Sequence, residues 1–156
     1  MHSAQMKGSL KTALAAFSAL LLLAALPARA QTETVLYKFN GGKHGAIPSS
    51  SLTSDGKGNF YGTTYGGGVK SGPSGYGTVF MLSPVGSGGW NQTVLHSFTG
   101  GADGANPIYS SVIFDNLGNL YGTAQGGGAN GSGVVFELIP AREKIGQKPF
   151  CTTLAR

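Results

Sequence analysis

One eleven-residue pattern occurs twice in this chain, and the duplication restricts the folds open to it more than any other feature. GNFYGTTYGGG occupies 58–68 and GNLYGTAQGGG occupies 118–128. The match extends well beyond the pattern, so that Phe39, for example, recurs as Phe98. Insertions and deletions between the copies fall where Gly and Ser cluster, as expected of loops. The chain is therefore a tandem repeat with a period of about 60 residues.

A period of this size is typical of solenoids and propellers, in which each unit buries its apolar face against a neighbour. Each copy holds four short segments rich in β-branched and aromatic residues and bounded by turn-forming residues. In the second copy they read TVLHSF, SSVIFD, LYGTA and GVVFELI. No stretch after Pro27 has a helical apolar period. We therefore expect an all-β fold of two four-stranded, propeller-like blades, a partial β-propeller.

Each copy also carries a turn pattern of Asp, Gly and Asn. DGKGN begins at Asp55, and DNLGN begins at Asp115. An Asp side chain caps its own turn and Gly supplies a positive φ, so we expect each pattern to close a hairpin. A calcium loop of the EF-hand type is the alternative, but Leu117 stands where such a loop needs an oxygen ligand.

The order of motifs from Val35 to Pro140 is specific. The series YxFxGGxxGxxP, DxxGNxYGTxxGGG and GxVFxL resembles the GloVer tandem repeat, which occurs in extracytoplasmic bacterial proteins that usually carry more copies. The resemblance covers most of the chain after its leader. It implies a propeller-like repeat and export, and it brings no activity, cofactor or site residue with it.

The first thirty residues are typical of a helical signal peptide. Two lysines precede an almost wholly apolar run from Ala13 to Leu26, which is too short for a comfortable membrane span. An Ala-x-Ala site ends at Ala30, so we expect the mature chain to begin at Gln31. The protein would then be secreted or held at the cell surface, with no membrane segment after cleavage. An uncleaved N-terminal anchor is the alternative.

Charge excludes one class of partner. Residues 31–140 carry four basic and five acidic side chains, and basic residues gather in the tail at 141–156. The repeat body is therefore near neutral, and we expect no nucleic-acid partner. Cys151 is the single cysteine, so no disulfide forms within the chain.

The sequence divides into 1–30 as leader, 31–140 as two repeats at about 35–93 and 94–140, and 141–156 as a degenerate basic tail. Propellers typically need four to eight blades, and two blades would leave apolar faces uncovered. We therefore expect self-association or further repeats. Loss of downstream repeats is the alternative, because the tail matches the repeat poorly.

Motifs for catalysis and cofactors are few. GGGANG, at 126–131, fits the GxGxxG pattern, but the strand-like VVFEL follows it where a dinucleotide site needs a helix. GxSxG, HExxH and Walker patterns do not occur. Asp103 and Glu137 are the acids inside the repeats that the copies do not share, and they are the residues on which a glycan-cleaving enzyme would depend. We predict no cofactor, no metal site and no enzyme.

Three residues are candidate ligand contacts. His44 and Asp103 occupy the same slot of GGKHGA and GGADGA, which indicates either a variable ligand-reading loop or a solvated loop tip. Tyr65, with Tyr61 and Tyr121, would suit stacking on sugars. Strand alternation instead favours a place for Tyr61 and Tyr121 in the core between the blades.

The resulting hypothesis is an exported, non-enzymatic interaction module that binds a glycan or a protein through loops 41–48 and 100–107. The alternatives are a carbohydrate-active enzyme on a propeller scaffold and a remnant of a longer repeat protein without a function of its own. The sequence does not identify the ligand, the oligomeric state or the final location of the protein.

Overall fold

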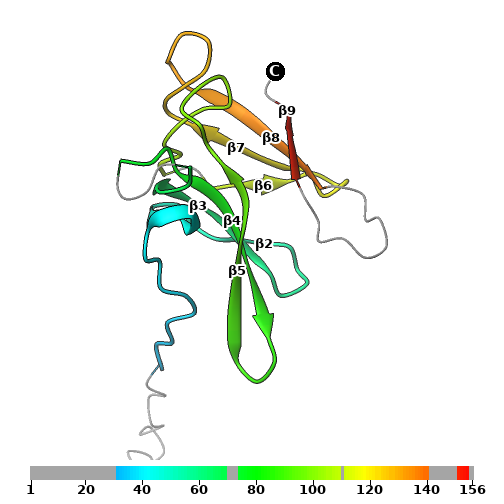
Figure 1. Ribbon diagram of the computed structural model, residues 1–156. Coiled ribbons are helices and arrows are strands. Elements are labelled where there is room, and N and C mark those ends of the chain that lie inside the picture. Colours follow the sequence, from blue (N-terminus) through cyan, green and yellow to red (C-terminus); the bar gives the residue numbers. More distant parts are fainter. Residues whose placement is uncertain (1–30, 70–73, 110, 141–150, 155–156) are drawn as a thin grey trace, which may run out of the picture. The chain divides into compact units, whose positions relative to one another are not determined.

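The computed structural model describes residues 31–69, 74–109, 111–140 and 151–154. The expected signal peptide and most of the basic tail lie outside these residues. The described residues form two antiparallel β-sheets and a single 3-10 turn, η1 at Gly42–His44 (Figure 1). None of them forms a helix with the length and apolar character needed to cross a bilayer. The all-β prediction is confirmed.

Residues 35–156 make up one compact unit that contains both sheets. The first sheet has the strand order β1-β3-β4-β5, with β2 also paired to β3, and the second has the order β6-β7-β8-β9. Neither order closes on itself. The strands of the first sheet are β1 Ala46–Pro48, β2 Thr53–Ser54, β3 Phe60–Gly66, β4 Thr78–Val85 and β5 Gly89–Ser97. Those of the second are β6 Ile113–Phe114, β7 Leu120–Ala124, β8 Val134–Pro140 and β9 Cys151–Leu154.

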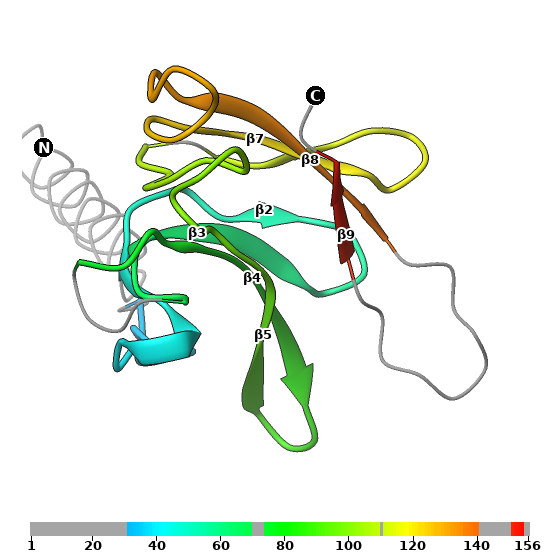
Figure 2. The same ribbon diagram turned by 45° about the horizontal axis from the view of Figure 1, so that its top comes forward.

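The two sheets repeat each other strand by strand. β2, β3, β4 and β5 correspond in order to β6, β7, β8 and β9, and Figure 2 shows β9 beside β8. The first sheet has five strands instead of the expected four because β1 also pairs with β3, through Ala46 and Gly66. In the second copy this pairing shrinks to one bridge between Ala105 and Gly126. Asn106, which follows Ala105, instead donates hydrogen bonds to the backbone carbonyls of Tyr65, Gly75 and Tyr76 in the first copy.

The glycine of the YGT motif is explained by a close approach. Gly62 lies opposite Phe80 on the neighbouring strand, and Gly122 lies opposite Phe136. A Cβ atom on Gly62 would come within 2.8 Å of the Phe80 ring, and one on Gly122 within 2.4 Å of the Phe136 ring. Each buried phenylalanine ring therefore lies over a strand position that has no side chain.

The two Asp turns have the same hydrogen bonds, and the turn prediction is confirmed. The Asp55 Oδ1 atom accepts bonds from the backbone N–H groups of Lys57 at 2.8 Å and Asn59 at 3.1 Å. The Asp115 Oδ1 atom accepts the equivalent bonds at 2.9 and 2.8 Å. Each turn joins two paired strands, β2 to β3 and β6 to β7.

Side chains alternate between the two faces of each sheet. We call the face with Phe80 and Leu82 in the first sheet, and Phe136 and Leu138 in the second, the front face. The opposite face is the back face, and it carries Tyr61, Thr63 and Val79 in the first sheet and Tyr121, Thr123 and Val135 in the second.

The back face of the first sheet packs against the front face of the second. Val79 is fully buried and belongs to one core cluster with Phe98, Phe136 and Leu138. The Thr53 hydroxyl donates a hydrogen bond to the carbonyl of Val112, which precedes β6. The duplicated unit therefore buries its apolar surface mainly against the other copy, as the repeat period predicts.

Candidate functional site

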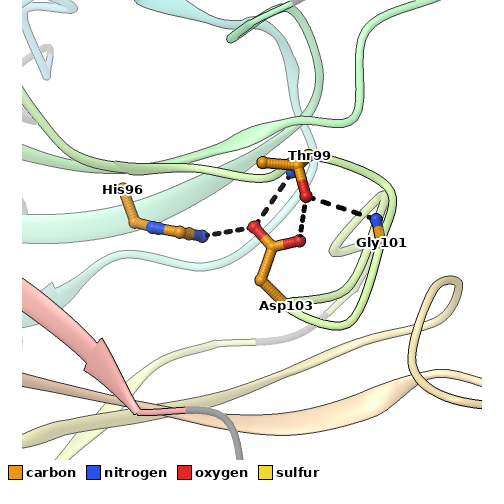
Figure 3. Close-up of polar contacts among 4 residues, drawn as sticks. All are labelled: His96, Thr99, Gly101 and Asp103. Carbon is orange, nitrogen blue, oxygen red and sulfur yellow. Dashed lines mark hydrogen bonds and ion pairs between the residues drawn. The ribbon is translucent and has the colours of Figure 1, made fainter.

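A histidine and an aspartate meet at the end of β5. The His96 Nε2 atom lies 3.1 Å from the Asp103 carboxylate, and Figure 3 shows the two side chains facing each other. The same carboxylate accepts bonds from the backbone N–H of Thr99, at 3.0 Å, and from the Thr99 hydroxyl. Asp103 therefore fastens its own loop to the strand that precedes it.

The electrostatics of this pair favour a neutral imidazole. Burial lowers the pKa of His96, and the nearby Asp103 carboxylate offsets this shift only in part. The His96 ring also packs edge-on against Phe98, with the ring centroids 4.7 Å apart. These contacts tie the loop to the core.

In the first copy, other residues hold the equivalent loop to β5. His44 fills the slot of Asp103, and its ring Nδ1 lies 3.2 Å from the Gln92 side-chain oxygen on β5. The Gln92 amide in turn donates to the His44 carbonyl at 2.9 Å. In both copies, then, the variable residue of the loop bonds to β5.

Tyr65 and Tyr61 have different surroundings, although both lie on β3. Tyr65 is half-buried, and its carbonyl accepts a bond from the Asn106 side chain at 2.9 Å. Tyr61 packs edge-on against Phe114, with centroids 4.8 Å apart, so its expected place between the sheets is confirmed. His44, Asp103 and Tyr65 thus bond to three different partners, and these bonds do not bring them together.

Tyr121, the counterpart of Tyr61, was also expected in the core between the sheets, but it does not pack against the core cluster of the described residues and its hydroxyl lies between two carboxylates. Its hydroxyl donates to Glu137 at 2.6 Å and lies 3.2 Å from Asp115. The hydrogen bond to Glu137 raises the pKa of Tyr121 to about 12. The acids that sequence reasoning singled out, Asp103 and Glu137, therefore bond to a histidine and a tyrosine respectively.

An open groove of about 590 Å³ runs between the two Asp turns. We call it the turn groove. The first turn contributes Ser54, Asp55 and Lys57, the second contributes 115–118, and Tyr61, Phe114 and Pro140 complete the lining. Leu117 is 84% exposed and stands in this lining beside the polar turn atoms.

The carboxylates that line the turn groove are already bonded. Burial alone would raise the pKa of Asp55, but bonds from the Asn59 side chain and from the Lys57 and Asn59 backbone outweigh it and lower the pKa. The pKa of Asp115 is lowered by the equivalent set of bonds, again against the effect of burial. Both groups therefore remain charged at neutral pH and act as acceptors within the turns.

A second cleft, of about 270 Å³, lies between the sheets and is mostly apolar. Its lining comes from both copies and includes Met81, Leu95 and Leu120. In the part of the chain that the structure describes, no group of three or more His, Cys, Asp or Glu side chains is placed to hold a metal ion.

The sequence did not reveal the turn groove, although it revealed both turns. The groove exists because stacking the copies brings Asp55 and Asp115 to the same end of neighbouring sheets. The repeated Asp turn was the sequence signal from which the groove could have been predicted, because equivalent turns of stacked repeat units lie along one face.

Comparison with known proteins agrees with the repeat architecture. The chain matches the family model described as the Gloeobacter/Verrucomicrobia repeat over residues 24–153, which is most of its length. No curated protein and no solved structure matches it. Because the family model spans both copies of the pattern, the chain belongs to the Gloeobacter/Verrucomicrobia repeat family, the GloVer repeat.

Proposed function

We propose that this protein is an exported, non-enzymatic interaction module that binds a glycan or a protein surface in the turn groove. In this proposal the two sheets are propeller-type blades, and they serve as a rigid frame for the turns at their ends. The turn groove carries the proposal, because it is an open site built by both copies at once.

The composition of the turn groove supports binding. Aromatic rings of Tyr61 and Phe114, an exposed Leu117 and the charged Lys57 side chain lie next to bonded turn carboxylates. Apolar faces beside polar groups suit contact with sugars and with protein surfaces. The turns are held by several hydrogen bonds each, so little conformational freedom is lost on binding.

Within the turn groove, the state of the two carboxylates supports binding over catalysis. A glycan-cleaving enzyme needs one carboxyl group with a raised pKa to serve as the general acid. The pKa values of Asp55 and Asp115 are instead lowered, and their oxygens accept bonds from the turns. The enzyme remains the alternative function, with Asp103 and Glu137 as the acids that it would require.

Binding is tested with oligosaccharides from cellulose, xylan and chitin, added to the full chain and followed by titration calorimetry. Leu117→Ser and Lys57→Ser should weaken binding severalfold, while Val85→Ser, on the exposed end of β4 outside the groove lining, should not. Equal affinity of the groove variants and the parent chain would contradict the proposal. Release of new reducing ends from any of these sugars would favour the enzyme.

Export is tested separately. The full chain, expressed in a bacterial host, should be recovered outside the cytoplasm with an N-terminus at Gln31. Recovery of the chain in the cytoplasm, with residues 1–30 still attached, would contradict the proposed location.

A further inference from the structure

A segment near the N-terminus repeats the outer strand of the first sheet but pairs with no strand among the described residues, although its Phe39 ring packs on Phe80. VLYKF, at 35–39, corresponds to VLHSF at 94–98. Val94–Ser97 is the end of β5 and pairs with β4, and the Phe98 N–H then donates to the Gly77 carbonyl at 3.0 Å. Residues 35–39, drawn in blue and cyan in Figure 1, have no strand partner.

Among the described residues, the second sheet has an unpaired length of edge at the corresponding place. β5 pairs with β4 from Thr78 to Val85, whereas β9 pairs with β8 only from Glu137 to Pro140. Among the described residues, nothing pairs with that edge of β8 over 134–136, which corresponds to 78–80 of β4. On β4, the equivalent stretch 78–80 is paired with Val94–Ser97, which are the counterparts of residues 35–38.

The described part of the back face of the second sheet is exposed as well. Val79 is fully buried, but its counterpart Val135 is 70% exposed, and Ile113 on the same sheet is 64% exposed. On the other side of the molecule, Leu52 is 48% exposed, although its counterpart Val112 is fully buried. Val135 and Leu52 are thus exposed apolar positions whose counterparts, Val79 and Val112, are buried in the contact between the two copies.

We propose that a second copy of this chain docks on the second sheet, with its segment Val35–Lys38 added as a strand to β8 along 134–136. The front face of its first sheet then covers Val135, as the second sheet covers Val79 within one chain. The template for this contact is the packing of the two copies already present in the molecule. Backbone hydrogen bonds would fix the position, and buried side chains would fix the register.

The pairing of β4 with β5 inside the first sheet predicts which residues would lie opposite each other in the proposed contact. His96 lies opposite Val79 and Ser97 opposite Thr78 in the first sheet. The same offsets place Tyr37 of the second copy opposite Val135, and Lys38 opposite Val134. The N–H of Phe39 would then donate to the Gly133 carbonyl, as the Phe98 N–H does to Gly77.

The contact is heterologous, because the segment of one copy meets a different surface of the next. Such contacts close into rings when the rotation allows it, and otherwise form open chains. A ring of about two to four copies would contain about four to eight sheets, the usual range of propellers. Glu137, on the back face of the second sheet, corresponds to Met81 on the back face of the first, and it accepts the Tyr121 hydrogen bond. This charged side chain makes the exposed face more polar before docking.

The proposal is tested by disulfide capture between two differently labelled full chains. In a Cys151→Ser background, Lys38→Cys is made in one chain and Val134→Cys in the other, and the two are mixed under mild oxidation. Opposite residues on neighbouring strands lie close enough for a disulfide, so a mixed dimer should form. Lys38→Cys mixed with Val85→Cys is the control, and an equal yield in both mixtures would overturn the proposal.

A second measurement follows the mass in solution by light scattering. The full chain should form multimers whose population rises with concentration, and Val135→Lys should shift it severalfold towards the monomer. Val85→Lys adds the same charge at another exposed valine and should leave the mass unchanged. Circular dichroism should show that both variants are folded, so that a change in mass does not reflect unfolding. A parent chain that is monomeric at every concentration, or a Val135→Lys variant with the parent's mass, would overturn the proposal.

Discussion

The ring of Tyr61 stands edge-on to the ring of Phe114, with centroids 4.8 Å apart and an interplanar angle of 87°. Tyr61 belongs to the first sheet and Phe114 to the second, so this pair joins the two copies of the repeat. The counterpart of Tyr61 in the second copy, Tyr121, bonds instead to Glu137. Identical motif positions therefore have different roles, depending on whether a neighbouring sheet covers them.

Tyr61→Ala should destabilise the protein far more than Tyr121→Ala. The first change removes an aromatic ring from the contact between the sheets, which typically costs about 3 kcal/mol. The second removes a ring from an uncovered face. Urea unfolding of the two variants measures the difference, and equal losses of stability would contradict the packing of back face on front face.

Gly122→Ala should destabilise the second sheet by about 1–3 kcal/mol, the usual cost of forcing an extra methyl into a packed core. The new Cβ would lie 2.4 Å from the Phe136 ring, which is buried and has little room to move. Gly101→Ala is the matched control, since its nearest neighbour, the Thr99 hydroxyl, lies 3.3 Å away. Thermal unfolding of both variants tests this, and a smaller loss for Gly122→Ala than for the control would refute it.

Asp55→Ala should cost about 1–2 kcal/mol, because it removes the acceptor of several turn hydrogen bonds. Asp55→Asn keeps an oxygen for the backbone N–H groups of Lys57 and Asn59 but loses the charge, so its loss should be smaller. The pKa of Asp55 is lowered on folding, so its contribution is present above its unfolded pKa of 3.8 and is lost as pH falls further. Unfolding of the three proteins at pH 7 and pH 3 should show the variants converging on the parent in acid.

Stability should also fall as the pH drops below 6.5, on account of His96. Its pKa is lowered in the folded protein, so the unfolded chain binds the proton more readily in the range just below 6.5. The contribution of neutral His96 is therefore complete above this value and decreases as acid is added. His96→Gln should flatten the pH dependence in this range. An unchanged slope in the variant would show that other groups cause it.

Local rules predicted the parts of the fold that depend on neighbours in sequence. The strands and the Asp turns were predicted because β-branched runs, Asp55 and Asp115 act over a few residues. The left-handed conformation of Asn106, with φ of 52°, was not predicted. Asn106 bonds to the Tyr76 carbonyl at 2.7 Å and to Tyr65 at 2.9 Å, and these partners come from the first copy.

The candidate ligand residues illustrate the same limit. The shared slot of His44 and Asp103 was visible in the sequence, but the partner of each was not. The His44 side chain hydrogen-bonds to Gln92, 48 residues away, and the Asp103 side chain hydrogen-bonds to His96. Both partners, Gln92 and His96, lie on β5. Repeat alignment finds equivalent positions, while the partners depend on how β5 lies beside each loop.

The back face of the first sheet packs on the front face of the second, and this packing decides which apolar positions of the repeat are buried. Val79 and Val135 are counterparts on the two back faces, and they are 0% and 70% exposed. Urea unfolding of Val79→Asp and Val135→Asp at low protein concentration tests this packing, because a buried unpaired carboxylate is severely destabilising and an exposed one is not. We expect Val79→Asp to abolish the cooperative transition and Val135→Asp to retain it. A cooperative transition in Val79→Asp that matches that of Val135→Asp would contradict this packing of the two sheets.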